Sequence, residues 1–454
     1  MAAEARSAEA PALKRAVGLP LLLMYGLGSM LGAGIYGLVG EAAKLMGSAI
    51  WIAFLVSMAA ALLTGLSYAT IASRYPRAGG AAYVTQRAYR SPAVAYLVGL
   101  AVACSGLTSI ATQANVVARN LQAAFGLEGV PPALLALGFL LILAGILLRG
   151  IKESLWANAV CTVVEAAGLL LVIAVGVPYW GSASLFDWPE GGGEATGTAL
   201  LVFQGAVLTF FSFIGFEDTL NLAEEVKDPE RTMPLGLILA MLIATGIYMA
   251  ICVTAVSVIP WRELAAAPAP LAAVVEKAAP WFPKVGFIGI TIFAVANTAL
   301  VNYVMASRLL YGMAKQGLLP APLARVHAGR QVPYVAILAL LAVVIGLSLL
   351  GDVAALAAAT VLLLLFVFAI VNGALVLLIR RPGEPQGRFA LPWIVPAFGA
   401  LVCLALIVVR VTSGNLTAPL IALGLLAAIL LLYVATRKRD GDAMERFVKS
   451  DALS

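Results

Sequence analysis

Long apolar runs recur along this chain and limit its fold more than any other feature. A helix of about 20 apolar residues is long enough to cross a bilayer, and we identify twelve such runs. Charged residues make up only 11% of the sequence, against about 25% in soluble domains. The sequence therefore predicts an all-α membrane protein with twelve transmembrane helices, at approximate positions 17–39, 47–72, 93–118, 132–149, 157–178, 199–222, 235–258, 285–307, 333–350, 354–379, 392–410 and 417–436.

Lysine and arginine predict how these spans are oriented. An even number of spans puts both termini on one side of the membrane. Of the 29 lysines and arginines, 23 fall on that side or in its loops, and the other six are Lys44, Arg119, Arg262, Lys277, Lys284 and Arg410. Because cytoplasmic loops carry the excess of these residues, both termini are predicted to be cytoplasmic.

Composition also excludes several classes of protein. The net charge of +6 follows from membrane orientation and does not indicate binding to nucleic acid. The four cysteines lie in separate apolar runs without the spacing of a metal site, and the single histidine, His327, falls in a basic loop. We find no nucleophile–base pair and no nucleotide-binding loop. We therefore predict that the protein is not an enzyme and uses no cofactor and no metal.

The first run contains a segment poorly suited to a continuous helix. Six glycines lie between Gly26 and Gly40, and each costs about 0.5–1 kcal/mol relative to alanine inside a helix. One explanation is that they let neighbouring helices approach closely. The other is that the backbone unwinds around Gly32-Ala33-Gly34 and turns its amides toward a ligand, where the positive end of a half-helix favours a carboxylate. The number of glycines and a second interrupted run favour unwinding.

The sixth run is interrupted as well. Its centre holds Gly215, followed by the adjacent carboxylates Glu217 and Asp218. Gly32 and Gly215 are about 180 residues apart, close to the length of five spans. Interruptions at equivalent positions predict two inverted repeats of five helices, with the ligand between the broken helices near the middle of the membrane.

Three acids fall within the predicted spans: Glu165 in the fifth, and Glu217 and Asp218 in the sixth. A carboxylate at membrane depth costs several kcal/mol, and no lysine or arginine lies comparably deep. Each acid is therefore protonated, hydrated or bound to a cation, because desolvation favours the neutral form. A structural role stays open for each of them. Glu217 or Asp218 could cap the second half of the broken helix, and Glu165 could hydrogen-bond a neighbouring backbone group.

Three loops carry recognisable patterns. Residues 74–92 are basic and aromatic and predict either an amphipathic segment at the inner surface or a solvated loop. Residues 261–284 contain a short helical pattern, Leu271–Lys277, and predict an outer helical hairpin over a vestibule. Residues 223–234 form a mixed-charge loop on the cytoplasmic side.

Three motifs resemble those of the amino acid–polyamine–organocation (APC) transporters. They are Gly28-Ser-Met-Leu-Gly-Ala-Gly-Ile35, the pair Phe210–Glu217 and Glu224–Pro234, and Ala306–Pro320, which contains Ala-Ser-Arg and ends in Gly-Leu-Leu-Pro. The likeness runs through nearly the whole chain and is closest to bacterial permeases similar to cationic amino acid transporters. It implies a five-plus-five inverted-repeat fold that works by alternating access, in the cytoplasmic (inner) membrane of a bacterium.

The resemblance also implies where the substrate lies. Its carboxylate is expected at the amides of Gly32, Ala33, Gly34 and Ile35, and its ammonium at carbonyls near Met30, Phe211, Phe213 and Ile214. Phe211 and Phe216 are expected to gate or line the side-chain pocket. Adjacent helical residues point about 100° apart, so we expect only one of the two acids Glu217 and Asp218 to face the ligand. The family motif favours Glu217. The predicted substrate-binding residues are Met30, Gly32, Ala33, Gly34, Ile35, Phe211, Ser212, Phe213, Ile214, Phe216 and Glu217.

The fifth span departs from the family pattern. Many proton-coupled members carry a lysine twelve residues after the glutamate of a Glu-Ser pair. Here the pair is Glu153-Ser154, and the residue twelve positions after Glu153 is Glu165. Coupling to a proton on Glu165, coupling to sodium, and exchange without an ion all stay open. We predict an amino acid transporter, with proton-coupled uptake preferred and with an amine or polyamine transporter as the main alternative.

The domain organisation follows from these assignments. We expect one transporter domain over residues 13–436, with the repeats at about 17–178 and 199–379 and two additional helices at 392–436. Residues 1–12 are predicted to form a disordered cytoplasmic tail, and residues 437–454 a second cytoplasmic tail. The first run is too long for a cleavable signal peptide.

Overall fold

A computed structural model describes residues 15–76, 80–127, 129–149, 155–189, 195–223, 225–315, 319–327, 329–330, 332–413 and 415–437. The predicted tail 1–12, residues 438–454 of the predicted tail 437–454, and Glu153, Ser154 and Glu224 lie outside this part of the chain. Every regular element within it is helical, and the one isolated β-bridge joins Val17 to Val226.

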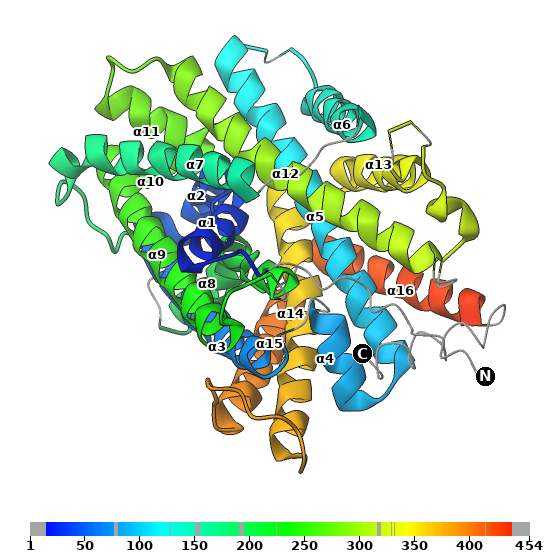
Figure 1. The fold of residues 1–454 in the computed structure, drawn as a ribbon. Helices are drawn as coiled ribbons and strands as arrows, with labels where there is room; N and C mark the ends of the chain where they lie inside the picture. The colour runs from blue at the N-terminus through cyan, green and yellow to red at the C-terminus, as the bar shows by residue number, and fades with distance from the viewer. Residues whose placement is uncertain are drawn as a thin grey trace, which may run out of the picture.

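The helices follow one another with short connections (Figure 1). In chain order they are α1 (Leu19–Met30), α2 (Ala33–Met46), η1 (Gly47–Ala49), α3 (Ile50–Arg74), α4 (Gly80–Tyr89), α5 (Pro92–Phe125), α6 (Pro132–Arg149), α7 (Leu155–Gly176), η2 (Val177–Tyr179), α8 (Ala195–Thr209), η3 (Phe210–Phe213), η4 (Phe216–Leu222), α9 (Pro229–Val258), α10 (Trp261–Ala266), α11 (Pro270–Ala278), α12 (Lys284–Lys315), η5 (Ala321–Ala324), α13 (Tyr334–Leu350), α14 (Val353–Arg380), α15 (Ile394–Thr412) and α16 (Thr417–Arg437).

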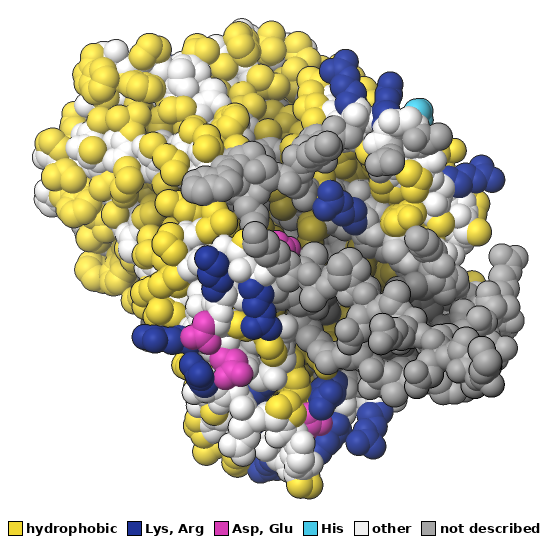
Figure 2. Space-filling view, viewed as in Figure 1, with side chains coloured by type: hydrophobic (Ala, Val, Ile, Leu, Met, Phe, Trp, Pro, Cys, Tyr) yellow, Lys and Arg dark blue, Asp and Glu magenta, His cyan; other side chains and the backbone are white. Residues whose placement is uncertain are grey.

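The prediction of an all-helical membrane protein is confirmed. Ten described segments are long and apolar enough to cross a membrane. The first, Leu19–Arg74, contains α1, α2 and α3, and Tyr334–Leu350 is an additional apolar helix shorter than 18 residues. Figure 2 shows hydrophobic side chains over the upper left of the face drawn, with charged side chains in the lower half of the view and at its upper right. Such a surface suits a chain surrounded by lipid.

Broken helices lie at the centre of the packing. α1 packs against α7 and α9, and α3 packs against α8 and α9. The long helices α5, α12 and α14 cross beside them, and α13, α15 and α16 lie toward the outside (Figure 1). Leu423 on α16 is 63% exposed and Leu401 on α15 is 62% exposed, so these helices present apolar surface to the surroundings.

The first predicted interruption is present. α1 ends at Met30 and α2 begins at Ala33, so that Leu31 and Gly32 separate two half-helices. The helix resumes two residues earlier than an interruption over Gly32-Ala33-Gly34 would require. Gly32 has φ −155° and ψ −142°, which is not a helical conformation.

The second interruption lies between η3 and η4. Ile214 is extended and Gly215 has φ +117°, a left-handed conformation that only glycine adopts readily. A Cβ atom on Gly215 would lie 2.5 Å from the carbonyl oxygen of Ser29 in α1. Glycine is therefore required at this position for its conformation and also for the close approach of α1.

Helices occupy two of the loops that were predicted to have structure. The pattern Leu271–Lys277 lies within α11, and α10 and α11 both pack against α2. On the opposite loop, α4 occupies part of residues 74–92 and packs against α5 and α14. Both loops therefore contact spans that line the site described below.

Candidate functional site

The two broken helices meet at their interruptions. Gly215 lies against Ser29 of α1, and Gly34 of α2 lies against Ser212 of η3. A Cβ atom on Gly34 would stand 2.6 Å from Ser212 Oγ and closer still to Ser212 Cα. The ends of the four half-helices therefore enclose one small region.

A cavity of about 30 Å³ occupies this region. Six of the predicted binding residues line it: Met30, Gly32, Ala33, Gly34, Phe211 and Ile214. The other lining residues are Ser29, Ser109, Gln113, Gly215, Asp218, Thr298 and Asn302. The structure thus brings together the core of the predicted site with polar side chains from α5 and α12.

The start of α2 offers backbone donors to this cavity. The first N–H groups of a helix have no acceptor within it, which applies to the amides of Ala33 and Gly34. The amide of Ile35, which was expected to join them, donates to the carbonyl of Gly32 at 3.2 Å, and that of Tyr36 donates to the same oxygen at 3.1 Å. The available donors therefore belong to the residues before Ile35.

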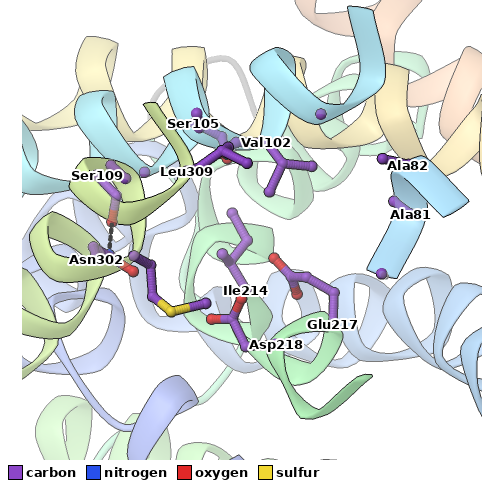
Figure 3. A pocket seen from close by; sticks show the side chains of 16 residues that line it. Ala81, Ala82, Val102, Ser105, Ser109, Ile214, Glu217, Asp218, Asn302 and Leu309 are labelled. Carbon is purple, nitrogen blue, oxygen red and sulfur yellow. Dashed lines mark hydrogen bonds between the residues drawn. The ribbon is translucent and has the colours of Figure 1, made fainter. Parts of the chain in front are cut away.

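A second cavity of about 200 Å³ adjoins the first. It lies between α4, α5, α12 and η4, and Figure 3 shows Glu217 and Asp218 opposite the α5 side chains. The two cavities share four lining residues, Ser109, Ile214, Asp218 and Asn302. Among the described residues that line either cavity there are two carboxylates and no lysine, arginine or histidine.

Glu217 and Asp218 differ in their surroundings. Both line the larger cavity, but only Asp218 also lines the smaller one. Glu217 Oε2 accepts a hydrogen bond of 2.9 Å from the amide of Gly215, so that this carboxylate caps the second interruption. Both side chains line the larger cavity although adjacent residues of a 3₁₀ helix point about 120° apart. The prediction that Glu217 is the acid facing the ligand stays a prediction.

Four predicted binding residues line neither cavity. Ile35 and Phe213 are fully buried, and Phe213 packs against Tyr248 with ring centroids 5.3 Å apart. Phe216 packs against Phe368 at 5.3 Å. Ser212 is buried, and its hydroxyl has no hydrogen-bond partner among the described residues. These side chains support the backbone of the interruptions.

A group of polar side chains from α5 and α12 was not predicted. Gln113 Nε2 and Asn302 Nδ2 each donate to Ser109 Oγ at 3.3 Å (Figure 3 shows the Asn302 bond). Gln113 Oε1 is buried without a partner in the described part of the chain. A signal existed in the sequence, because Ser105, Ser109 and Gln113 repeat every four residues and so share one face of a helix.

Tyr248 of α9 was also missed. Its hydroxyl lies 2.8 Å from the carbonyl oxygen of Met30 and 2.7 Å from that of Ser212. The side chain is fully buried, and its ring contacts Phe54 and Phe213. A single tyrosine in an apolar run gives no sequence signal for such a contact.

Glu165 lies beside the first interruption, on α7. Its carboxyl is fully buried, Oε1 accepts a hydrogen bond of 3.1 Å from Asn297 Nδ2, and Oε2 has no partner among the described residues. The hydroxyl of Tyr36 in α2 donates to the backbone carbonyl of Glu165 at 2.6 Å. A buried acid with a free oxygen therefore connects α2, α7 and α12.

A charged cluster outside the spans holds α4 next to the larger cavity. Glu384 Oε2, in the loop after α14, lies 2.8 Å from both Arg87 Nε and the Tyr75 hydroxyl, which donate to it. Arg381 also donates to the carbonyl of Ala88 at 2.7 Å. Burial alone would raise the pKa of Glu384, but the hydrogen bonds from Arg87 and Tyr75 and the charges of Arg87 and Arg381 outweigh it and lower that pKa.

The described residues contain no group of three or more His, Cys, Asp or Glu side chains that could hold a metal ion. Their cysteines Cys104, Cys161, Cys252 and Cys403 are all free. His327 is exposed, and its Nδ1 accepts a hydrogen bond from the amide of Gly329.

Comparison with known proteins identifies the family. Residues 18–435 match the family described as amino acid permease. The branched-chain amino acid permease BcaP of Bacillus subtilis is 27% identical over 94% of each chain. The chloroplastic cationic amino acid transporter 9 of Arabidopsis thaliana is 32% identical over 71% of this chain and 59% of its own length. Cationic amino acid transporter 4 of Mus musculus is 30% identical over 76% of this chain and 56% of its own length.

The chain therefore spans less than two thirds of those two cationic transporters, and nearly the whole length of the bacterial permease. The family and these relatives are transporters and not enzymes. A helical membrane chain, two broken helices around a shared cavity and a match from residue 18 to residue 435 agree with one another. This chain belongs to the amino acid permease family of the APC superfamily.

Proposed function

We propose that this protein is a secondary active transporter of α-amino acids that works by alternating access. The observation that carries the proposal is the small cavity between the interruptions. It is bordered by the first-turn amides of α2, which suit a carboxylate, and by the end of α1 at Met30, where a carbonyl suits an ammonium group. A zwitterion is the ligand whose two charged groups match these two ends.

The proposed architecture has twelve crossings. It counts Leu19–Arg74 as two crossings and adds Tyr334–Leu350 to the ten long segments. Helices α1 to α7 then form the first repeat and α8 to α14 the second, with an interruption in the first span of each. The excess of lysine and arginine in alternate loops supports cytoplasmic termini in a bacterial inner membrane.

In this topology the larger cavity lies on the cytoplasmic side of the site, because α4 belongs to a cytoplasmic loop. The opposite side is closed by contacts to α2. Arg119 Nη1 on α5 lies 2.7 Å from Glu41 Oε1 on α2, and Gly40 packs against Pro270 of α11. The conformation is therefore closed toward the outside, with the larger cavity leading from the site toward the cytoplasm.

The main alternative substrate is an amine or polyamine. Such a ligand would use the carboxylates Glu217 and Asp218 and would have no use for the amides of α2. A relative named as a branched-chain permease and relatives named as cationic amino acid transporters support amino acids as substrates. These names do not decide which amino acid side chain the protein prefers.

We further propose that Glu165 carries a coupling proton. It is buried, it has one oxygen without a described partner, and it contacts α12 while its backbone contacts α2. Those contacts lie where alternating access would change the surroundings of an acid. Sodium coupling and exchange without an ion are the alternatives.

Uptake into proteoliposomes tests the proposal. Purified protein is reconstituted, and uptake of a radiolabelled amino acid is measured with competition by free amino acids and by their decarboxylated amines. We expect inhibition by amino acids and little inhibition by the amines. Stronger inhibition by the amines would favour the alternative substrate, and uptake no different from that of empty liposomes would contradict amino acid transport.

A further inference from the structure

The hydroxyl of Tyr248 bridges the two interruptions. It lies within 2.8 Å of the carbonyl oxygens of both Met30 and Ser212, which belong to different half-helices. Tyr248 itself belongs to α9, and no atom of it lines either cavity. The side chain thus reaches the two interruptions from behind the site.

Both carbonyls have lost their usual helical donors. The last turn of α1 closes with the amide of Leu31 donating to Leu27, and the residue four positions after Met30 already belongs to α2. The amide of Gly215, three residues after Ser212, donates to Glu217 instead. In a buried region such acceptors are costly when they have no partner, so the contact with Tyr248 is needed.

One hydroxyl proton serves two acceptors. A tyrosine hydroxyl carries a single proton, which it donates to one carbonyl at a time or shares between them. The negative ends of two carbonyl dipoles therefore converge on one hydroxyl proton. Met30 borders the small cavity, whereas Ser212 does not, so a ligand can reach the first carbonyl only.

We propose that Tyr248 is a positioning residue whose hydroxyl proton stands in for the substrate ammonium in the empty carrier. When an amino acid binds, its ammonium donates to Met30, and the tyrosine proton turns to Ser212. When the amino acid leaves, the proton is shared again and keeps the two carbonyl ends together. This inference rests on the proposed transport of amino acids, and it explains how the interruptions stay paired without a ligand.

The empty carrier and the loaded carrier should respond differently to loss of the Tyr248 hydroxyl. In Tyr248→Phe the empty carrier has no donor for either carbonyl, whereas in the loaded carrier the ammonium still donates to Met30 and only Ser212 is left without a donor. The return of the empty carrier should therefore be slowed more than the movement of the loaded carrier. The Met30 carbonyl, without its tyrosine donor, should also attract the ammonium more strongly and lower the KM.

Two flux modes separate these steps. Efflux from loaded proteoliposomes into substrate-free buffer requires the empty carrier to return, whereas exchange against external substrate does not. For Tyr248→Phe we expect efflux to fall about tenfold, in the range for an unpaired buried acceptor. Exchange should stay within about threefold of the parent, with a lower KM.

Tyr303→Phe is the matched control. Tyr303 is also fully buried in a span, and its hydroxyl donates to the carbonyl of Ile337 at 2.7 Å, on α13 and away from the interruptions. This variant should leave the ratio of efflux to exchange unchanged. An equal loss of efflux and exchange in Tyr248→Phe, or an unchanged ratio, would overturn the inference.

A binding measurement covers the case in which Tyr248→Phe is too unstable for flux assays. Saturating amino acid should raise the Tm of Tyr248→Phe in detergent by more than it raises that of the parent or of Tyr303→Phe. A smaller or equal increase would contradict the inference. If the parent transports no amino acid, the proposed function fails, and that outcome is visible without any variant.

Discussion

A methyl group added at Gly34 should disable the site while the protein still folds. The new Cβ would stand 2.6 Å from Ser212 Oγ, whereas ordinary contact begins at 3.4 Å, and the backbone at Ser212 Cα is closer still. A flexible side chain could move away, but backbone cannot do so cheaply. Gly34→Ala must therefore separate α2 from η3 by about 1 Å.

The size of the effect follows from the kind of contact. Overpacking in a well-packed core costs about 1–3 kcal/mol, which corresponds to roughly 5- to 150-fold in an equilibrium. The strain falls on the wall of the small cavity, so substrate affinity should fall within that range. A displacement of 1 Å at a positioned site can alone cost about 100-fold in rate.

The assay compares Gly34→Ala with Gly246→Ala. Gly246 lies within α9, and a Cβ added there meets nothing within 4 Å, so alanine should be neutral or slightly stabilising. Membrane expression, the Tm in detergent and the KM for amino acid uptake are measured for both variants. Wild-type affinity in Gly34→Ala would refute the reasoning that close packing of Gly34 shapes the site.

Three further predictions concern acids. Glu165→Gln keeps an oxygen for Asn297 but cannot carry a proton, so proteoliposomes should still exchange substrate and should lose accumulation driven by a pH gradient; accumulation equal to the parent would make Glu165 structural. Glu217→Gln should change the pH profile of uptake more than Asp218→Asn does, and the opposite order would assign the ligand to Asp218, which borders both cavities. Glu384→Gln removes the carboxylate that accepts hydrogen bonds from Arg87 and Tyr75. The pKa of Glu384 is lowered in the folded protein. The stabilising effect of the carboxylate is therefore complete above the unfolded pKa of about 4.3 and is lost as the pH falls through the folded pKa. The Tm difference between parent and Glu384→Gln should therefore be constant from pH 6 to 8 and should shrink in acid, and a difference that does not depend on pH would contradict this.

The interruptions could be predicted because the effect of glycine on a helix depends on the local sequence alone. Gly32 and Gly215 weaken a helix wherever they stand, and in lipid an interrupted helix needs a reason. Local propensity does not fix the residue at which a helix resumes, which is why α2 starts at Ala33 and the amide of Ile35 is used within the first turn.

Contacts between distant spans could not be predicted in the same way. Tyr248 is 36 residues from Ser212 and 218 residues from Met30, and nothing in an apolar run marks either partner. The resemblance to the family implied that Phe216 gates or lines the side-chain pocket. In the structure its ring packs against Tyr68 of α3 and Phe368 of α14, and a role at the substrate stays a prediction.

The isolation of Glu165 has an electrical consequence. Its only described carboxyl hydrogen bond comes from Asn297, a neutral side chain, so an ionised Glu165 keeps its full negative charge. If Glu165 carries the coupling proton as proposed, a carrier loaded with an amino acid of uncharged side chain crosses without net charge at this site, and it returns empty with the negative charge of Glu165. An inside-negative membrane potential favours that outward return, by up to about 2.3 kcal/mol per 100 mV for a complete crossing. The voltage would then act on the empty carrier and not on its cargo.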